Sequence, residues 1–194
     1  MAQFTKEFFA TIGNWEGGFQ CDPDDSGNYD SKKRLIGTNR GIAAQTLETY
    51  YKRFKRIDLS LMSIEAFKEI LKALTYADAF VIAKKLFWDA INCDAFTNQS
   101  VAEIVFDWYW ASYAYGMQWM QGCLRTIGIN VQVDLKLTVT EVGLMNAYLD
   151  QEALFNFIKA ERLKYTAWLC KKNPKKEKYH IGWDRRIQSY KYSA

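Results

Sequence analysis

Apolar residues recur at intervals of three and four along most of the chain, the spacing of one face of an α-helix. Phe4, Phe8 and Ile12 form the first stripe, and Gly17 and Gly18 follow it as residues that can end a helix. The same pattern predicts further helices over residues 43–55, 64–73, 77–90, 98–115, 117–127, 139–149, 151–172 and 181–190. The chain is therefore predicted to be mainly α.

Two helix starts resemble a capping box, in which a Thr and an acidic residue three positions later cap each other's backbone. Thr138 with Glu141 fits this pattern, and Thr75 with Asp78 fits it in a weaker form. Strand patterns are scarce. The best is "GINVQVDL" at residues 128–135, where valines alternate with polar residues.

Residues 18–41 lack a helical pattern and contain the turn-forming residues Pro23, Gly27, Asn28, Gly37 and Gly41. We expect a long loop that has room for a short hairpin. Loops of this length in compact domains are usually functional or disordered, so this segment is the first place to look for a site.

The composition is that of a globular chain with a sizeable core: 49% of its 194 residues are hydrophobic, 16% are aromatic and two are prolines. One main domain with a C-terminal extension is expected. No apolar run reaches the roughly 18 residues of a membrane-spanning helix, and "MAQFTKEFFATIGNWEGG" lacks the features of a signal peptide. We expect no integral membrane segment and synthesis in the cytoplasm.

The four cysteines (Cys21, Cys93, Cys123 and Cys170) show no Cys-x-x-Cys spacing and have apolar or aromatic neighbours. We interpret them as free buried thiols. The single histidine, His180, lies far from any cysteine pair in the sequence, so no metal site is expected. Phosphate-binding glycine loops and nucleophile motifs are absent, and no cofactor is expected.

Positive charge gathers at the C-terminal end, although the formal net charge is only +4. From Lys159 onward, eleven Lys or Arg residues face three acidic ones. Such an end favours an anionic partner such as a wall polymer, a membrane surface or a nucleic acid, and a solvated helix end explains it equally well. No recognisable nucleic-acid-binding module is present, so a nucleic acid partner is not expected.

The stretch "IGNWEGGFQCDPDDSGN", residues 12–28, places Glu16 four residues after Ile12, at the end of the first apolar stripe. Partial desolvation and the negative end of the helix dipole are expected to raise its pKa, which suits a general acid. The loop that follows can hold a water or stabilise a cation opposite Glu16 through Asp22, Asp24, Asp25, Thr38 and Asn39. This is an arrangement that glycosidic bond hydrolysis uses. An ordinary helix end is the alternative interpretation.

Two other carboxylates lie among apolar neighbours. Asp107 interrupts "VFDWYWASYAYG" and is expected to be a buried structural group that caps a helix or ties down a loop. Glu161 is expected to pair with Arg162, Arg185 or Arg186. The aromatic run "DWYWASYAYGMQW" can stack on sugars or bases, but its helical spacing is more typical of a core.

Several segments, in order, resemble glycoside hydrolase family 108, whose members include proteins called secretion-activating proteins. "EGGFQCDPDDSGN" followed by "TNRGI" is similar to the opening motif of that family. "AKKLFWDAINCDAF" and "SVAEIVFDWYWAS" resemble its next two helices, and "FNFIKAERLKY" with "NPKKEKYHIGWDRRI" resembles its C-terminal segment. The resemblance covers nearly the whole chain.

The resemblance implies a lysozyme-like helical fold, with a catalytic region over residues 1–110. A C-terminal helical region over residues 111–194, expected to bind peptidoglycan, would pack on it as one compact unit. The implied partners are peptidoglycan glycan strands. A holin or secretion machinery would deliver the protein from the cytoplasm to the cell wall or periplasm.

The resemblance also implies hydrolysis of the β-1,4 bond between N-acetylmuramic acid and N-acetylglucosamine, with Glu16 as the catalytic acid and no cofactor or metal. Asp22 and Thr38 match motif positions and are expected to orient the hydrolytic water. The residues expected to bind substrate are Trp15, Phe19, Asp25, Asn39 and Trp108.

This chain departs from the family pattern in places. "NYDSKKRLIG" at residues 28–37 stands where the family usually has a short glycine-rich link, and Ala111, Ser112 and Tyr113 replace an Asn-Ser-Gly turn. Asp-Gly and Gly-Pro elements expected near "VDLKLTVTEV" are also missing. The alternative function is therefore a catalytically inactive peptidoglycan-binding or secretion-accessory protein.

Overall fold

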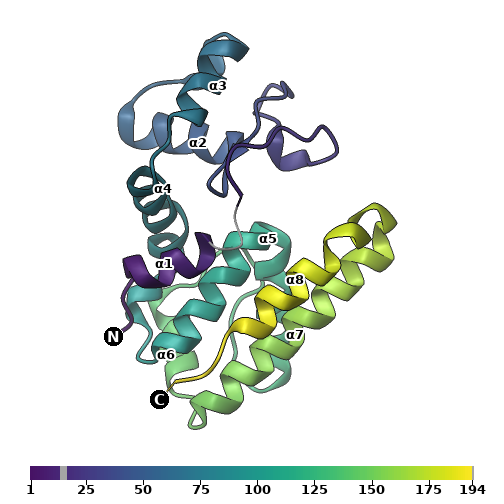
Figure 1. The fold of residues 1–194 in the computed structure, drawn as a ribbon. Coiled ribbons are helices and arrows are strands. Elements are labelled where there is room, and N and C mark those ends of the chain that lie inside the picture. Colours follow the sequence, from purple (N-terminus) through teal and green to yellow (C-terminus); the bar gives the residue numbers. More distant parts are fainter. Residues whose placement is uncertain (14–16, 194) are drawn as a thin grey trace. The chain divides into compact units, whose positions relative to one another are not determined.

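The computed structural model describes residues 1–13 and 17–193, and the chain in these ranges is mainly α-helical (Figure 1). The predicted class is confirmed. Two short antiparallel strands, β1 (Thr38–Asn39) and β2 (Ile42–Ala43), form the one sheet named in the described ranges. The α-helices are α1 (Lys6–Gly13), α2 (Ala44–Tyr50), α3 (Ile64–Lys72), α4 (Tyr76–Ala83), α5 (Gln99–Thr126), α6 (Val139–Asn146), α7 (Gln151–Lys172) and α8 (Glu177–Ser189).

Shorter helical turns extend or connect these helices. Two are of the π type, η2 (Tyr51–Lys55) after α2 and η4 (Lys84–Trp88) after α4. The helices predicted at 98–115 and 117–127 are one element, α5, which Tyr113 interrupts with φ 42° and ψ −124°. The 3₁₀ turns are η1 (Ser26–Asn28), η3 (Leu59–Leu61), η5 (Asp89–Ile91), η6 (Cys93–Ala95) and η7 (Pro174–Lys176).

The chain divides into two compact units. The first unit is Thr5–Leu86, and the second unit is Met1–Phe4 together with Phe87–Ala194. The domain boundary expected between residues 110 and 111 lies inside α5. Both residues belong to this continuous helix and to the second unit. Among the described residues, no helix is both long and apolar enough to cross a bilayer.

Both predicted capping boxes are confirmed. Thr75 at the start of α4 accepts the backbone N–H of Asp78, and the Asp78 carboxylate accepts the backbone N–H of Thr75. Thr138 and Glu141 make the same reciprocal bonds at the start of α6. Local sequence is sufficient here because each cap needs only residues within four positions.

The strand prediction for residues 128–135 is wrong. These residues are irregular and pair with no strand: some of their backbone N–H groups bond to nearby backbone carbonyls and two bond to side chains. Gln121 of α5 accepts the N–H of Asp134 at 2.9 Å, and Glu141 accepts the N–H of Gln132 at 2.7 Å. The alternating valines had suggested a sheet, but these polar side chains satisfy the backbone locally.

In the first unit, α1 packs on α4 through aromatic rings. The ring of Phe9 lies 5.2 Å from that of Tyr76 and 5.7 Å from that of Phe80, measured between centroids. The Tyr76 hydroxyl also donates to the Lys6 carbonyl at 3.1 Å. Phe9 is therefore buried against the start of α4, and Phe8 and Ile12 of the predicted stripe are buried as well.

In the second unit, a buried carboxylate joins three helices. Asp107 of α5 is fully buried, as expected for a structural group. Arg162 of α7 donates to its Oδ2 at 2.5 Å, and Arg186 of α8 donates to its Oδ1 at 2.6 Å. Burial opposes ionisation, but the two guanidinium charges outweigh it and lower the pKa of Asp107 from 3.8 to about 2.

The prediction that Glu161 pairs with an arginine is wrong. Its carboxylate accepts from Lys164 at 2.6 Å and from the Cys123 thiol at 3.2 Å. Arg162 and Arg186 are unavailable because both point to Asp107. A buried anion holds these cations more strongly than a partly exposed one can.

Ionised Asp107 should make the fold acid-sensitive. Since its pKa is lower in the folded chain than in the unfolded chain, its contribution of ~2 kcal/mol is complete above pH ~4 and is lost as the pH falls towards ~2. We predict that Asp107→Asn removes this pH dependence. It should also lower the unfolding free energy at pH 7 by ~3 to 5 kcal/mol, because two buried cations lose their anion.

Urea unfolding between pH 2 and pH 7 measures both effects. Glu152→Gln, an exposed carboxylate in the first turn of α7, is the matched control and should change stability by less than ~0.5 kcal/mol. Equal stability of Asp107→Asn and the native chain at pH 7 would contradict the role given to this ion cluster.

Candidate functional site

The predicted catalytic residue Glu16 and the predicted substrate-binding residue Trp15 lie outside the described residues. The described chain ends α1 at Gly13 and resumes at Gly17. The described part of the candidate site consists of the residues on either side and the loop that follows.

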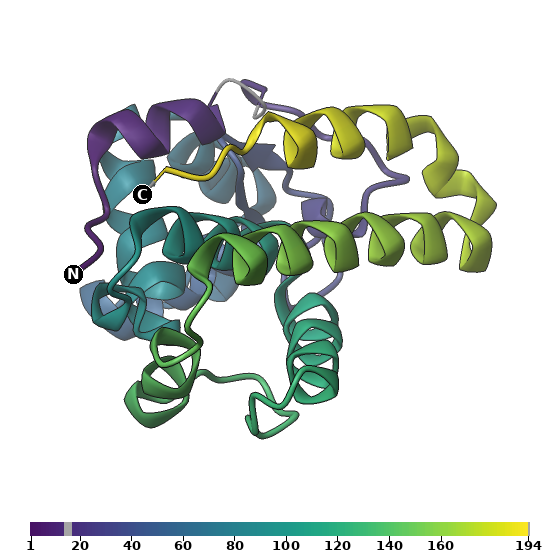
Figure 2. The same ribbon diagram turned by 90° about the horizontal axis from the view of Figure 1, so that it is seen from below.

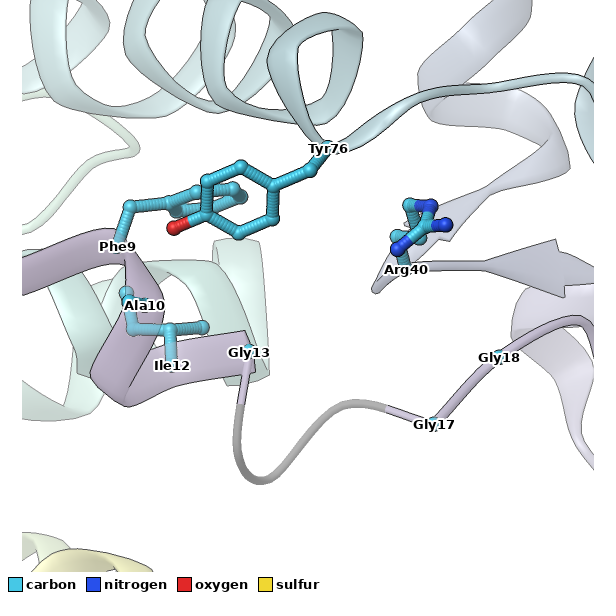
Figure 3. A pocket seen from close by; sticks show the side chains of 8 residues that line it. All are labelled: Phe9, Ala10, Ile12, Gly13, Gly17, Gly18, Arg40 and Tyr76. Carbon is cyan, nitrogen blue, oxygen red and sulfur yellow. The ribbon is translucent and has the colours of Figure 1, made fainter. Parts of the chain in front are cut away.

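A cavity of about 320 Å³ lies beside these flanking residues in the first unit (Figure 3). The rings of Phe9 and Tyr76 lie together at one edge of it, and the side chain of Arg40 faces them from the hairpin. An aromatic wall suits the apolar face of a sugar ring, and a guanidinium group offers donors to its oxygens. The full lining is Phe9, Ala10, Ile12, Gly13, Gly17, Gly18, Arg40 and Tyr76.

The hairpin turn places Arg40 at this cavity. Arg40 and Gly41 are the two residues between the paired Asn39 and Ile42, and both have positive φ, 52° and 75°. Two consecutive positive φ angles are typical of the type I′ turn, whose twist matches that of the strands. The Nε of Arg40 donates to the Leu74 carbonyl at 3.0 Å, which holds the side chain in place.

Gln20 closes the long loop, and we refer to its bonds as the Gln20 clasp. Its backbone pairs with Thr38 through bonds of 2.8 and 2.9 Å. Its side-chain oxygen accepts from the Asn28 amide at 2.7 Å and from the Asp22 N–H at 2.9 Å, and its side-chain nitrogen donates to Asp25 at 3.0 Å. The clasp thereby brings Asp22 and Thr38, the two predicted water-orienting residues, to the same end of the loop.

The insertion at residues 28–37 forms an ordered loop of its own and leaves the pairing of Gln20 with Thr38 intact. Tyr29 and Leu35 form an antiparallel bridge near the two ends of this loop. Inside it, Asp30 is buried, accepts two backbone N–H groups through Oδ1 and pairs with the Arg34 guanidinium at 2.6 Å. The chain returns at Gly37, so Thr38 still reaches the Gln20 clasp.

Two of the predicted site residues, Asp25 and Asn39, use their side chains mainly to stabilise the loop and the hairpin. Asp25 caps η1 through Oδ1, which accepts the Gly27 N–H at 2.9 Å, and its Oδ2 is bound by Gln20. Asn39 is buried, and its amide donates to the Leu71 carbonyl at 2.9 Å at the end of α3. Both residues therefore hold the loop and hairpin in position.

Asp22 is half-buried, and its Oδ1 accepts the Asp24 N–H at 2.9 Å. Phe19 keeps 38% of its surface exposed, and the Lys72 ammonium lies 5.3 Å from its ring centroid. Both side chains are partly exposed to solvent. Thr38 has its backbone in the Gln20 clasp.

The prediction for Trp108 needs correction. It lies in the second unit and is only 1% exposed, with its ring 5.9 Å from that of Tyr165 on α7. Because the aromatic run has helical spacing, the Trp108 indole points into the core. It has no open face with which to stack on a sugar.

Sequence reasoning missed Gln20, Asp30, Arg40 and Tyr76. Asp30 had a detectable signal, since an acid and a base four residues apart often pair, and Asn-Arg-Gly marked the hairpin turn. Gln20 and Tyr76 had none: Thr38, the backbone partner of Gln20, lies 18 residues away, and Lys6, whose carbonyl accepts from Tyr76, lies 70 residues away.

Comparison with known protein families places this geometry in context. The profile described as glycosyl hydrolase 108 matches residues 9–112, more than half of the chain. The chain belongs to glycosyl hydrolase family 108. The family 108 match contains Glu16, the Gln20 clasp and the cavity, and it ends inside α5.

A solved structure supports the fold of this family 108 chain. The structure of Brucella abortus SagA is similar with a TM-score of 0.66 at 22% sequence identity, over 95% of this chain and 91% of that one. The likeness therefore extends through the C-terminal helices beyond the family match. No curated protein shows significant sequence similarity to the chain.

The close approach at Gly37 provides a test of the loop. Gly37 has φ 120°, and a Cβ there would lie 2.6 Å from the Gln20 carbonyl oxygen and 2.8 Å from the Phe19 ring. We predict that Gly37→Ala lowers the unfolding free energy by more than ~1 kcal/mol, because both the backbone angle and the contact are unfavourable.

Thermal and urea unfolding measure this change. Gly18→Ala is the control in the same loop, since a Cβ there meets nothing within 4 Å. If Gly37→Ala were as stable as Gly18→Ala, the tight contact between Gly37 and Gln20 would not exist in solution.

Proposed function

We propose that this family 108 chain hydrolyses the β-1,4 bond between N-acetylmuramic acid and N-acetylglucosamine in peptidoglycan, with Glu16 as the general acid. Family membership supports glycoside hydrolysis. The observation that carries the assignment to this part of the chain is the cavity, which is lined by Gly17, the residue next to Glu16, together with an aromatic wall and Arg40.

In the proposed reaction, Glu16 donates its proton to the glycosidic oxygen as the bond to the anomeric carbon breaks. Positive charge then develops on the sugar ring in an oxocarbenium-like transition state. A water held near Asp22 and Thr38 attacks the anomeric carbon and passes a proton to the Asp22 carboxylate. The Gln20 clasp supports this step because it keeps these two residues together.

The stereochemical outcome depends on what stands opposite Glu16. A water between the acid and a distant base leads to inversion, whereas a carboxylate only about 5 Å from the acid acts as a nucleophile and leads to retention. Asp22, whose backbone N–H is held by the Gln20 clasp, is the loop carboxylate proposed to act on a water. Inversion is the expected outcome.

The basic C-terminal end is proposed to contact anionic wall polymers. Lys171, Lys172 and Lys175 are exposed where α7 meets α8. In this proposal the protein acts at the cell wall or periplasm and is delivered there by a holin or by secretion machinery.

A second candidate function is peptidoglycan binding without hydrolysis. The engagement of Asp25 and of the Asp22 Oδ1 in loop hydrogen bonds favours it, because fewer carboxylate oxygens are then free to activate water. The cavity with its aromatic wall would serve binding equally well.

We predict that Glu16→Gln abolishes the release of reducing ends from purified peptidoglycan, with a loss of at least ~10²-fold, because the amide cannot donate the required proton. Mass analysis should find fragments of the native reaction that end in N-acetylmuramic acid. Glu65→Gln, which makes the same change at an exposed carboxylate in the first turn of α3, is the matched control and should keep its activity.

Full activity of folded Glu16→Gln would refute the assignment of the acid. If the native chain and the variant both sediment with insoluble peptidoglycan and neither cuts it, the binding function replaces the enzymatic one.

We also predict that Arg40→Gln raises KM for peptidoglycan fragments about tenfold with a smaller change in kcat, because a donor that binds the sugar in the ground state is lost. Arg53→Gln removes the same charge from an exposed position outside the cavity and should leave KM unchanged. Equal effects of the two variants would mean that only the net charge matters.

A further inference from the structure

The turn between α7 and α8 brings together three side chains that commonly bind metals. Cys170 in the last turns of α7 and Glu177 and His180 in the first turn of α8 place a sulfur, a carboxylate oxygen and a ring nitrogen within 4.8 Å of one another. Cys170 and His180 are ten positions apart in the sequence, and the turn brings them close together in space. Figure 2 shows the two helices running back along each other from this turn.

Local sequence accounts for the placement. Asn173 ends α7 and accepts the Lys175 N–H at 3.2 Å, which starts the 3₁₀ turn η7 with Pro174 at its first position. Glu177 and His180 then lie three residues apart on one face of α8. That face is turned towards Cys170, which is buried.

The distances are close to those that zinc requires. The His180 Nδ1 and the Glu177 Oε1 are 3.5 Å apart. Zinc bonds of about 2.0 to 2.3 Å at tetrahedral angles put ligand atoms roughly 3.3 to 3.8 Å apart. The histidine and glutamate already meet this requirement, and the widest pair of the three has to close by only about 1 Å.

A second layer of side chains lies next to the histidine. Its other nitrogen, Nε2, lies 3.6 Å from the Asp184 Oδ1. The Thr166 hydroxyl donates to the same Asp184 oxygen at 3.2 Å. Metal-binding histidines commonly direct their second nitrogen to a carboxylate that is itself hydrogen-bonded, which sets the ring orientation and raises ligand basicity.

The proposed ligands are open to solvent on one side. Glu177 is 67% exposed, so an ion can enter from solvent on its side. Cys123, the other thiol with a carboxylate neighbour, has no histidine near it among the described residues.

We propose that Cys170, Glu177 and His180 bind one divalent transition metal ion, with zinc the best match, and that the ion fastens the turn between α7 and α8. A sulfur, nitrogen and oxygen donor set at tetrahedral spacing suits zinc better than magnesium or calcium, which prefer oxygen ligands. On binding, the Cys170 thiol becomes a thiolate and releases its proton to solvent. The fourth position is left to a water molecule.

Cobalt(II) is the probe, because it accepts the same ligands as zinc and shows a thiolate-to-metal charge-transfer band when a cysteine binds it. We expect the purified full chain to develop this band with one equivalent of Co²⁺ and to lose it when Zn²⁺ is added. Cys170→Ser and His180→Gln should each lose the band or bind at least about tenfold more weakly. Cys123→Ser, the matched thiol control, should keep it.

Asp184→Asn separates a metal site from a simple hydrogen-bond cluster. It should keep the band but weaken Co²⁺ binding about 10-fold to 100-fold, because the orienting carboxylate is lost. Absence of the band in the native chain, or its persistence in folded Cys170→Ser, would overturn the proposal. Circular dichroism checks the folding of each variant, and Zn²⁺ should raise the Tm of the native chain and leave that of Cys170→Ser unchanged.

Discussion

The second unit depends on one buried charge. Asp107 lies in the core, and an ionised carboxylate there is tolerated only because Arg162 and Arg186 reach it from two other helices. A shift of α5, α7 or α8 would leave at least one of these charges unpaired in an apolar surrounding. The ion cluster therefore determines how the three helices pack, in a way that interchangeable apolar contacts would not.

The same anchor positions the turn that carries the proposed metal ligands. Cys170 lies about two turns beyond Arg162 on α7, and Glu177 lies about two and a half turns before Arg186 on α8. Because both helices are held at Asp107, their far ends meet in a defined register at η7. That register allows a thiol and an imidazole from different helices to come within metal-binding distance.

The first unit is held differently, since its long loop is organised by polar groups. The Gln20 clasp and buried Asp30 satisfy backbone groups that a loop would otherwise expose, and the aromatic contacts of Phe9 fasten α1 to α4. An ordered loop of this kind can present Asp22 and Thr38 in fixed positions. Such order is needed for water positioning in a glycoside hydrolase, and also for binding without turnover.

Local patterns in the sequence determined the mainly α class, both capping boxes and the order of the family segments, because each of these depends on residues close together in the chain. Only the tertiary structure decided three features: the burial of Trp108, the irregular conformation of the valine-rich segment at 128–135, and which side chains lie next to His180. Each depends on partners from other helices: Tyr165, Gln121 and Cys170, respectively. Sequence spacing specifies which face a side chain occupies, but packing between distant elements decides what that face meets.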